Sequence, residues 1–330
     1  MRVLYIHGTK SRVRYRREVL RELLEKDGRF DVESVETPFD KKEPDALCDR
    51  LERGDYDIVL SSNPWWLGET NGRVVADMAS RPEKLVVYDL SDNWSPDELS
   101  VRLMRMSDMV GVSARYLAEL AKENCPTTGF YPNGVRSSSI ERDDSFTTAA
   151  RYVYAGQLRK LDLSALDRLL TLDPAGEVDV YAVDYDSVAD VVMDLVPERV
   201  HILEPVTHKD LQGRLHAYRY GLALFKAAET TVRGMLPDKY FDYCQAGIPT
   251  VYSNCTELAH EDFKRTAFDV NADGFSLGSI APAAEDFQAV VEKYDMRKSL
   301  LRFIDDMAAL YARADRPKAF EKTWRAPWEE

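Results

Sequence analysis

Short apolar runs alternate with helical patterns through the first half of the chain, and this alternation restricts the fold more than any other feature of the sequence. Strands are predicted at residues 3–7, 32–35, 58–61, 85–90 and 109–112, and helices at 15–25, 44–53, 72–79, 96–104 and 115–123. Buried strands joined by helices are typical of a parallel, doubly wound α/β sheet. Because ligands of such sheets bind at the carboxyl ends of the strands, functional residues are expected in the loops after His7, Ser61, Leu90 and Val112.

The length of the chain predicts two domains. Its 330 residues, of which 45% are hydrophobic, are enough for two cores of ordinary size. Polar residues dominate from 136 to 149, which is typical of an interdomain linker. We therefore predict an N-terminal domain at residues 1–140, a linker at 141–150 and a C-terminal domain at 151–315.

Charge and cysteine content narrow the class of protein. The formal net charge of -13 argues against a protein that coats nucleic acid, because neutralising phosphates requires a basic face. The four cysteines are scattered without the spacing of zinc ligands, which indicates reduced thiols and a cytoplasmic protein. No apolar run has the length of a signal peptide or a transmembrane helix, so the chain is expected to be soluble or at most peripheral to a membrane.

Basic residues gather around the start of the first predicted helix: Lys10, Arg12, Arg14, Arg16, Arg17 and Arg21. They can meet an anionic acceptor or the head groups of anionic lipids, and an ordinary solvated face is the open alternative. The loop before this helix has neither G-x-G-x-x-G nor G-x-x-x-x-G-K-[ST], so neither a dinucleotide site nor a P-loop is predicted. No H-E-x-x-H or comparable metal-binding set occurs in the sequence.

Residues 236–249 (LPDKYFDYCQAGIP) combine a short helix with a cation and a carboxylate. Proline at its start and glycine at its end predict a helix between the strand-like runs 222–225 and 250–253. Lys239 and Asp242 stand at i and i+3, on one face near the helix N-terminus. A helix N-terminus with a lysine binds phosphate, and a carboxylate accepts from the hydroxyls of a ribose, which together indicate a nucleotide. An ordinary ion pair on a solvated helix is the alternative.

The whole stretch reads P-x-K-x-x-[DE]-Y-x-x-x-G-x-P and resembles the C-terminal signature of GT-B glycosyltransferases, especially the group 1, family 4-like enzymes. This resemblance implies two Rossmann-like domains that face each other across a cleft, with residues 316–330 returning to the first. It also implies that Asp242 holds the donor ribose, at a position where glutamate is usual. Gly234 stands where many members carry a glutamate that contacts the donor sugar.

The resemblance extends to other segments of the C-terminal half. Residues 152–160 (YVYAGQLRK) are similar to the family segment that faces the donor phosphates, and residues 200–206 to the strand that borders the nucleobase. Two cations beside a glycine suit the developing charge of a leaving diphosphate. The donor-binding residues implied in this way are Gly156, Arg159, Lys160, Val206, Lys226, Pro237, Lys239, Asp242 and Glu257.

The N-terminal half offers residues for an acceptor and for catalysis. Residues 88–94 look like the family segment Y-D-x-x-D-x-W, which makes Asp92 or Asp89 the expected base of an inverting enzyme; a helix cap near Pro96 is the alternative for Asp92. Two tryptophans follow the third predicted strand, where an aromatic face can stack on a sugar or can simply be core. The expected acceptor-binding residues are Gly8, Asn63 and Trp65.

These features together predict a metal-independent glycosyltransferase without a cofactor. It would move a sugar from a nucleotide-diphosphate sugar, such as a UDP sugar, to a hydroxyl of a glycan, a lipid-linked sugar or a small molecule. Two alternatives stay open: a nucleotide-sugar 2-epimerase, which shares the fold, and a non-catalytic binding or scaffold protein.

Overall fold

The computed structural model describes residues 1–8, 14–37, 45–62, 69–90, 98–136, 140–182, 198–227 and 235–321. The chain divides into two compact units, each built on a six-stranded sheet. Unit 1 comprises Met1–Asn133 and Met296–Glu330, and unit 2 comprises Gly134–Asp295. All recorded strand pairs in both sheets are parallel, which confirms the predicted α/β class.

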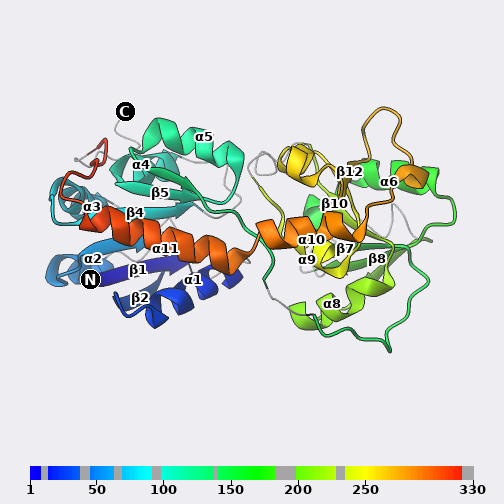
Figure 1. The fold of residues 1–330 in the computed structure, drawn as a ribbon, viewed down its shortest axis with the longest axis horizontal. Coiled ribbons are helices and arrows are strands. Elements are labelled where there is room, and N and C mark those ends of the chain that lie inside the picture. The colour runs from blue at the N-terminus through cyan, green and yellow to red at the C-terminus, as the bar shows by residue number, and fades with distance from the viewer. Residues whose placement is uncertain are drawn as a thin grey trace. The chain divides into compact units, whose positions relative to one another are not determined.

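The sheet of unit 1 has the strand order β2-β1-β3-β4-β5-β6 (Figure 1). Its strands are β1 (Arg2–Gly8), β2 (Asp31–Thr37), β3 (Ile58–Ser61), β4 (Leu85–Leu90), β5 (Met109–Val112) and β6 (Thr128–Phe130). Its helices are α1 (Arg14–Lys26), α2 (Asp45–Arg53), α3 (Glu69–Ser80), α4 (Glu98–Met106), α5 (Arg115–Asn124) and α11 (Met296–Ala312). The order of the strands reverses between β1 and β3, the kind of position where open α/β sheets bind ligands.

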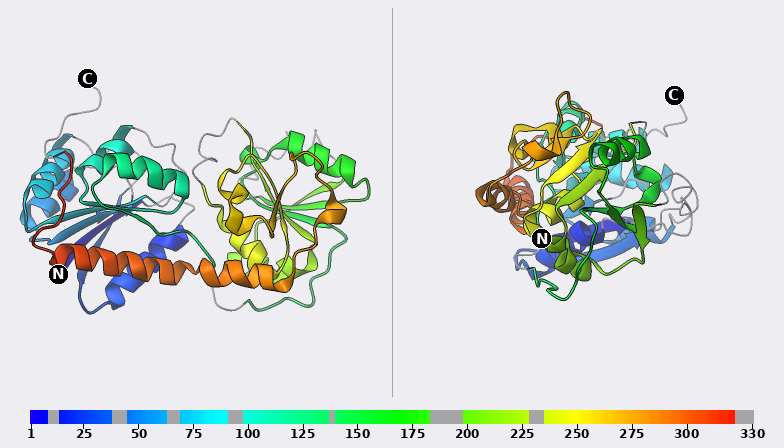
Figure 2. Two further views of the ribbon diagram at one scale, coloured as in Figure 1. Left: turned by 45° about the horizontal axis from the view of Figure 1, so that its top comes forward. Right: turned by 90° about the vertical axis from the view of Figure 1, so that its right-hand side faces the viewer.

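Two apolar clusters cover the two faces of this sheet. Side chains of α2 to α5, such as Leu51 and Leu103, pack on one face, and side chains of α1 and α11, such as Leu20 and Phe303, pack on the other. Figure 2 shows α11, in red and orange, and α5 on opposite sides of the strands. Because both faces are covered, the central strands β3, β4 and β5 are buried at every residue, as the sequence predicted, whereas the edge strand β2 is mostly half-exposed.

Helix α11 belongs to unit 1, although its sequence was assigned to the C-terminal domain. The chain returns to unit 1 at Met296 and not at Arg316. Phe303 lies edge-on to Tyr131, with 5.0 Å between ring centres, and the Tyr131 hydroxyl donates to Asp306 at 2.6 Å. The apolar stripe of α11 therefore completes the core of unit 1, a choice of partner that helical spacing does not reveal.

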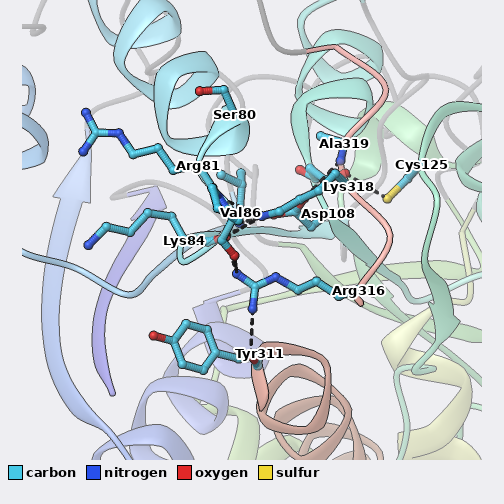
Figure 3. A network of polar contacts seen from close by, with 12 residues as sticks. Ser80, Arg81, Lys84, Val86, Asp108, Cys125, Tyr311, Arg316, Lys318 and Ala319 are labelled. Carbon is cyan, nitrogen blue, oxygen red and sulfur yellow. Dashed lines mark hydrogen bonds and ion pairs between the residues drawn. The ribbon is translucent and has the colours of Figure 1, made fainter. Parts of the chain in front are cut away.

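The segment after α11 is fastened to the amino-terminal edge of the unit-1 sheet (Figure 3). The Arg316 guanidinium donates to the carbonyl oxygens of Tyr311 at 2.7 Å and Lys84 at 2.8 Å, and also to that of Pro82. The Ala319 amide donates to the buried Asp108 carboxylate at 3.0 Å. These bonds close the edge of the sheet where β4 and β5 begin.

The sheet of unit 2 has the order β12-β11-β10-β7-β8-β9. Its strands are β7 (Tyr152–Gly156), β8 (Val178–Ala182), β9 (Val200–Leu203), β10 (Tyr220–Leu224), β11 (Thr250–Ser253) and β12 (Ala267–Asp269). Its helices are α6 (Leu163–Leu172), α8 (His208–Arg214), α9 (Asp238–Ala246) and α10 (Ala284–Lys293), with short 3-10 turns that include η1 (Leu158–Lys160), η2 (Leu215–Ala217) and η4 (Glu257–Ala259). Helix α6 packs on one face, and α8, α9 and α10 supply side chains to clusters on the other.

The polar tract predicted as a linker is packed against unit 2 where the structure describes it. Phe146 contacts the ring of Tyr218, Ala150 is buried, and the Thr148 hydroxyl donates to Asp179 at 2.8 Å. Its described residues, 140–150, therefore belong to the domain and are not a free connector. The polar composition predicted an exposed segment, but Phe146 and Ala150 pack against an apolar cluster of unit 2.

Candidate functional site

The strand order of unit 2 reverses between β7 and β10, and the residues predicted to bind phosphate meet beside these two strands. Gly156 ends β7 with a φ of +153°, a conformation that side chains disfavour. A Cβ atom at this position would lie 2.8 Å from Nζ of Lys239, which projects from the first turn of α9. The glycine therefore permits both the backbone turn and the close approach of the lysine.

The Lys239 amino group is held by aromatic rings. Its Nζ lies 3.9 Å from the centre of the Tyr154 ring and 5.2 Å from that of Phe225. Among the described residues, no hydrogen bond or ion pair of Lys239 is recorded. Burial and, to a smaller extent, the nearby charge of Lys160 together lower the pKa of Lys239 to about 7. A cation in this position gains most from an anion that replaces the missing counter-charge.

Asp242, one turn further along α9, is a buried carboxylate held by two side chains of α8. Its Oδ1 lies 3.0 Å from Nε2 of His208 and 3.2 Å from Nε2 of Gln212. Burial alone would raise the pKa of Asp242, but the His208 hydrogen bond and the charge of Arg136 outweigh it and hold that pKa below its usual value. The carboxylate is therefore an acceptor, and the Nε2 atom of His208 donates to it.

His208, which contacts Asp242, is not among the site residues predicted from the sequence. It is the first residue of α8 and follows the strand β9 that leads to Val206. The signal available in the sequence is a polar residue close to the carboxyl end of a parallel strand. Val206 itself is partly buried beside the apolar cluster of α8 and α9.

The other predicted phosphate ligands occupy one turn beside Lys239. Arg159 and Lys160 lie in η1, directly after Gly156; Arg159 is exposed and its Nε donates to Gln157 at 2.9 Å. The Lys226 amide donates to the carbonyl of Lys160 at 3.1 Å, so the chain after β10 is joined to this turn. The charge of Lys160 acts on Lys239, and the backbone of Lys226 is joined to the same turn.

A buried polar clamp fixes the strand ends behind this corner. Asn254, with a φ of +54°, donates from Nδ2 to Asp162 at 2.9 Å and to the Phe225 carbonyl at 2.7 Å. Asp162 in turn caps α6 through the amides of Ser164 and Ala165. These bonds join the carboxyl ends of β10 and β11 to the turn that carries Lys160. No sequence motif predicted them.

A hollow of about 380 Å³ opens beside the clamp. It is lined by Ala227, Tyr252, Asn254, Cys255, Thr256, Ala259, Asp269 and Asn271. Glu257, predicted to lie near the donor, is buried at the start of η4 next to this hollow, and Pro237 precedes α9 as its N-cap residue.

In unit 1, the carboxylate of Asp89 is buried and bonded to the guanidinium of Arg16. Nη2 and Nε of Arg16 donate to its two carboxylate oxygens at 2.9 and 3.4 Å, and both side chains are fully buried. Nη1 of the same guanidinium donates to the Tyr131 carbonyl at 2.9 Å. Because the Asp89 carboxylate is enclosed and already bonded to a guanidinium, its contacts indicate a structural role. Asp92 therefore remains the predicted catalytic base. Asp92, Asn63 and Trp65 lie outside the described residues.

The basic first helix differs from the expectation of a charged outer face. Arg16 and Arg17 are buried, and Nη2 of Arg17 donates to the Ser62 carbonyl at 3.0 Å. Arg21 lies 3.7 Å from Glu25 on the exposed side. The two buried arginines therefore bond to groups at the carboxyl ends of the strands, the edge of the sheet where Gly8 ends β1. They do not form a lipid-binding surface.

Two features are absent from the described residues. None of the helices that the structure describes combines the length and apolarity of a membrane-spanning segment. In the same residues, no three histidine, cysteine, aspartate or glutamate side chains are grouped as they would be around a metal ion.

Solved structures similar to this chain include two kinds of nucleotide-sugar enzyme. AviGT4, a glycosyltransferase involved in avilamycin A biosynthesis, superposes with a TM-score of 0.62 at 11% identity, over 94% of this chain and 98% of that one. The UDP-GlcNAc 2-epimerase from Neisseria meningitidis bound to UDP-GlcNAc gives 0.57 at 12%, over 94% and 100%. An alpha-glucosyltransferase in complex with UDP and a 13-mer DNA containing an HMU base gives 0.58 at 14%, over 94% and 99%.

The sequence itself has no such match. No protein-family profile matches it, and no curated protein matches it. At these identities the structural similarity establishes the fold, and the predicted GT-B fold is confirmed. The likeness to family 4 in particular stays a prediction.

Proposed function

We propose that unit 2 binds a nucleotide-diphosphate sugar, a UDP sugar in the first instance, and that the protein transfers the sugar to a hydroxyl acceptor. The observation that carries this proposal is the pair formed by Lys239 and Asp242 on one face of α9. An amino group that lacks a recorded hydrogen-bond acceptor among the described residues stands one turn from a buried, ionised carboxylate. This order of charges suits a diphosphate followed by a ribose.

The diphosphate would lie at the Gly156 corner. Because residue 156 has no side chain, Nζ of Lys239 can lie next to its backbone, and Lys239, Lys160 and Arg159 would neutralise the charge that develops on the leaving diphosphate. These cations and the N-terminus of α9 are proposed to take the part that a divalent ion plays in other transferases. Neither a metal nor a cofactor is included in the proposal.

The acceptor is proposed to bind at the carboxyl edge of the unit-1 sheet, with Gly8, Asn63 and Trp65 as its contacts. The order of the strands reverses there, between β1 and β3, which is where open α/β sheets bind their ligands. If the reaction inverts the sugar configuration, Asp92 is the proposed base that takes the proton of the acceptor hydroxyl.

A nucleotide-sugar 2-epimerase is the second candidate, because solved epimerases superpose on this chain as well as the glycosyltransferases do. The two reactions differ in their need for an acceptor. An epimerase converts UDP-GlcNAc to its 2-epimer when no acceptor is present, whereas a transferase forms a new glycoside only when an acceptor is added. Product analysis by NMR with and without a panel of hydroxyl acceptors separates them.

The first test is nucleotide binding. Thermal shift and calorimetry with UDP, GDP, ADP, TDP and their common sugar conjugates should identify one base that stabilises the wild type, by about 2.7 kcal/mol at a hundredfold excess over Kd. The Lys239→Ala and Asp242→Ala variants should lose this response. Lys209→Ala is the matched control, since Lys209 is exposed on α8 and pairs with Glu141 at 2.7 Å. If no nucleotide stabilises the wild type, the proposed function is wrong.

A further inference from the structure

The hollow of about 380 Å³ in unit 2 lies at the carboxyl edge of the sheet. Its lining residues follow three neighbouring strands: Ala227 comes after β10, Asn254 after β11, and Asp269 and Asn271 stand at and just after the end of β12. Open α/β sheets bind their ligands at this edge. The volume is near the lower end of the range for small-molecule sites, about 300–1,000 Å³, which suits a single sugar ring better than an oligosaccharide.

The hollow adjoins the corner that holds the amino group of Lys239. Nζ of Lys239 lies 5.2 Å from the centre of the Phe225 ring, and the Phe225 carbonyl accepts from Nδ2 of Asn254, a lining residue, at 2.7 Å. Burial raises the pKa of the Cys255 thiol, another lining group, to about 12, and the charge of Lys239 acts on this pKa in the opposite direction. Both relations place the amino group close to one wall of the hollow.

The groups proposed to hold the donor follow one another along the carboxyl edge of this sheet, in which the strand order is β12-β11-β10-β7-β8-β9. Asp242, proposed for the ribose, is bonded to His208 of α8, the helix that follows β9. Lys239, proposed for the diphosphate, approaches Gly156 at the end of β7. The hollow lies at the ends of β10, β11 and β12, so in this order it comes after Lys239. A nucleotide-diphosphate sugar bound in the same order would carry its sugar toward the hollow.

The walls of the hollow offer hydrogen-bonding groups and one negative charge. Oδ1 of Asp269 accepts from the backbone amide of Asn271 at 2.9 Å, and among the described residues no hydrogen bond to its Oδ2 is recorded. Tyr252 is the register partner of Asp269 on β11, and burial, with the charge of Asp269, raises the pKa of Tyr252 to about 12. The hydroxyl of Tyr252 therefore stays protonated and can donate. None of the lining residues that the structure describes is a lysine or an arginine.

We propose that this hollow receives the sugar of the donor and selects uncharged sugars over uronic acids. The inference rests on the proposed nucleotide site and adds the class of sugar that the site takes. Asp269 accepts from a hydroxyl of the sugar, and Tyr252 and Thr256 offer hydroxyls of their own. A uronic acid would bring a second carboxylate next to Asp269, where no described lining residue carries a compensating positive charge.

The test is calorimetry with UDP, UDP-glucose, UDP-GlcNAc and UDP-glucuronate on the wild type and on variants. At least one of the two neutral conjugates should bind to the wild type roughly tenfold more tightly than UDP-glucuronate. Asp269→Asn, which keeps an oxygen for the Asn271 amide, should remove this preference and leave UDP unchanged. Thr256→Trp, at an exposed lining residue, should fill the hollow, weaken the neutral conjugates roughly five- to tenfold and leave UDP unchanged.

The matched control is Asp273→Asn. Asp273 is exposed, four residues beyond Asp269, and is not among the lining residues, so all four affinities should stay unchanged. The inference is overturned if the wild type binds UDP-glucuronate as tightly as the neutral conjugates. It is also overturned if Thr256→Trp leaves the neutral conjugates unchanged, or weakens UDP as much as it weakens them. UDP binding that is lost in Lys239→Ala would still support the proposed function in these cases, whereas a wild type that binds no UDP would overturn both the UDP-sugar proposal and this inference.

Discussion

The amino group of Lys239 lies 3.9 Å from the centre of the Tyr154 ring, and no carboxylate is recorded within salt-bridge distance of it among the described residues. The ring faces the cation with its negative quadrupole, which stabilises the charge less than an ion pair does. A second ring, Phe225, lies 5.2 Å away. The amino group of Lys239 can therefore pair with an anionic ligand. Among the described residues, no recorded carboxylate would have to be displaced for this.

This environment makes nucleotide binding depend on pH. Desolvation lowers the pKa of Lys239 from its ordinary 10.5 to about 7, and a bound diphosphate should raise it again. Above pH 7 binding must then take up a proton, so affinity should fall as pH rises. Calorimetry of UDP at pH 8, in two buffers of different ionisation enthalpy, should show uptake of close to one proton. In Lys239→Met the uptake should vanish, and an equal uptake in that variant would assign it to another group.

Gly156→Ala should abolish nucleotide binding. The added Cβ would meet Nζ of Lys239 at 2.8 Å, and the φ of +153° strains any side chain, at a cost of about 1–3 kcal/mol. Gly274→Ala is the matched control, because Gly274 also has a positive φ, of +75°, but open space around it. Both variants should lose stability in thermal unfolding, and only Gly156→Ala should lose UDP affinity. Full affinity in Gly156→Ala would show that the corner does not receive the phosphates.

Asp89→Asn should destabilise unit 1 by about 3–5 kcal/mol, because it leaves the buried Arg16 guanidinium without its counter-charge. Thermal unfolding measures the loss. The double variant Arg16→Met with Asp89→Leu should recover much of it. A catalytic base behaves differently: its removal would leave the melting temperature intact and lower turnover, and that result would return Asp89 to the catalytic site.

The chain end beyond α11 should contribute to the stability of unit 1. Arg316→Met removes hydrogen bonds to three backbone carbonyls, those of Tyr311, Lys84 and Pro82, at a cost of roughly 2–4 kcal/mol. Arg313→Met serves as control, since that exposed side chain pairs only weakly with Asp315 at 3.4 Å. UDP affinity should stay unchanged in both, because Lys239 and Asp242 belong to unit 2. Equal melting temperatures for the two variants would show that Arg316 is dispensable.

Several features of the fold followed from local sequence signals. The helix predicted within residues 236–249 is α9, Asp238–Ala246, and Gly247 ends it with a φ of +74°. The strand predicted at 250–253 is β11. Apolar periodicity, proline at a helix start and glycine at its end act over a few residues, so they can be seen in the sequence.

Contacts between distant residues did not follow from the sequence. His208 reaches Asp242 across 34 positions, and Arg16 reaches Asp89 across 73. A histidine at a helix start and an arginine on a helix have the same local signature whether they face water or a buried carboxylate. The sequence therefore predicted a carboxylate at the site but not the residue that holds it.

The sequence by itself determined the alternation of strands and helices, the position of α9 and the presence of Lys239 and Asp242 on it, because these depend on spacing along the chain. Only the tertiary structure decided which core α11 completes, that Arg16 neutralises Asp89, and that His208 stands beside Asp242. The physical reason is that an apolar stripe or a polar side chain fits many partners, and the packing of the whole unit selects one of them.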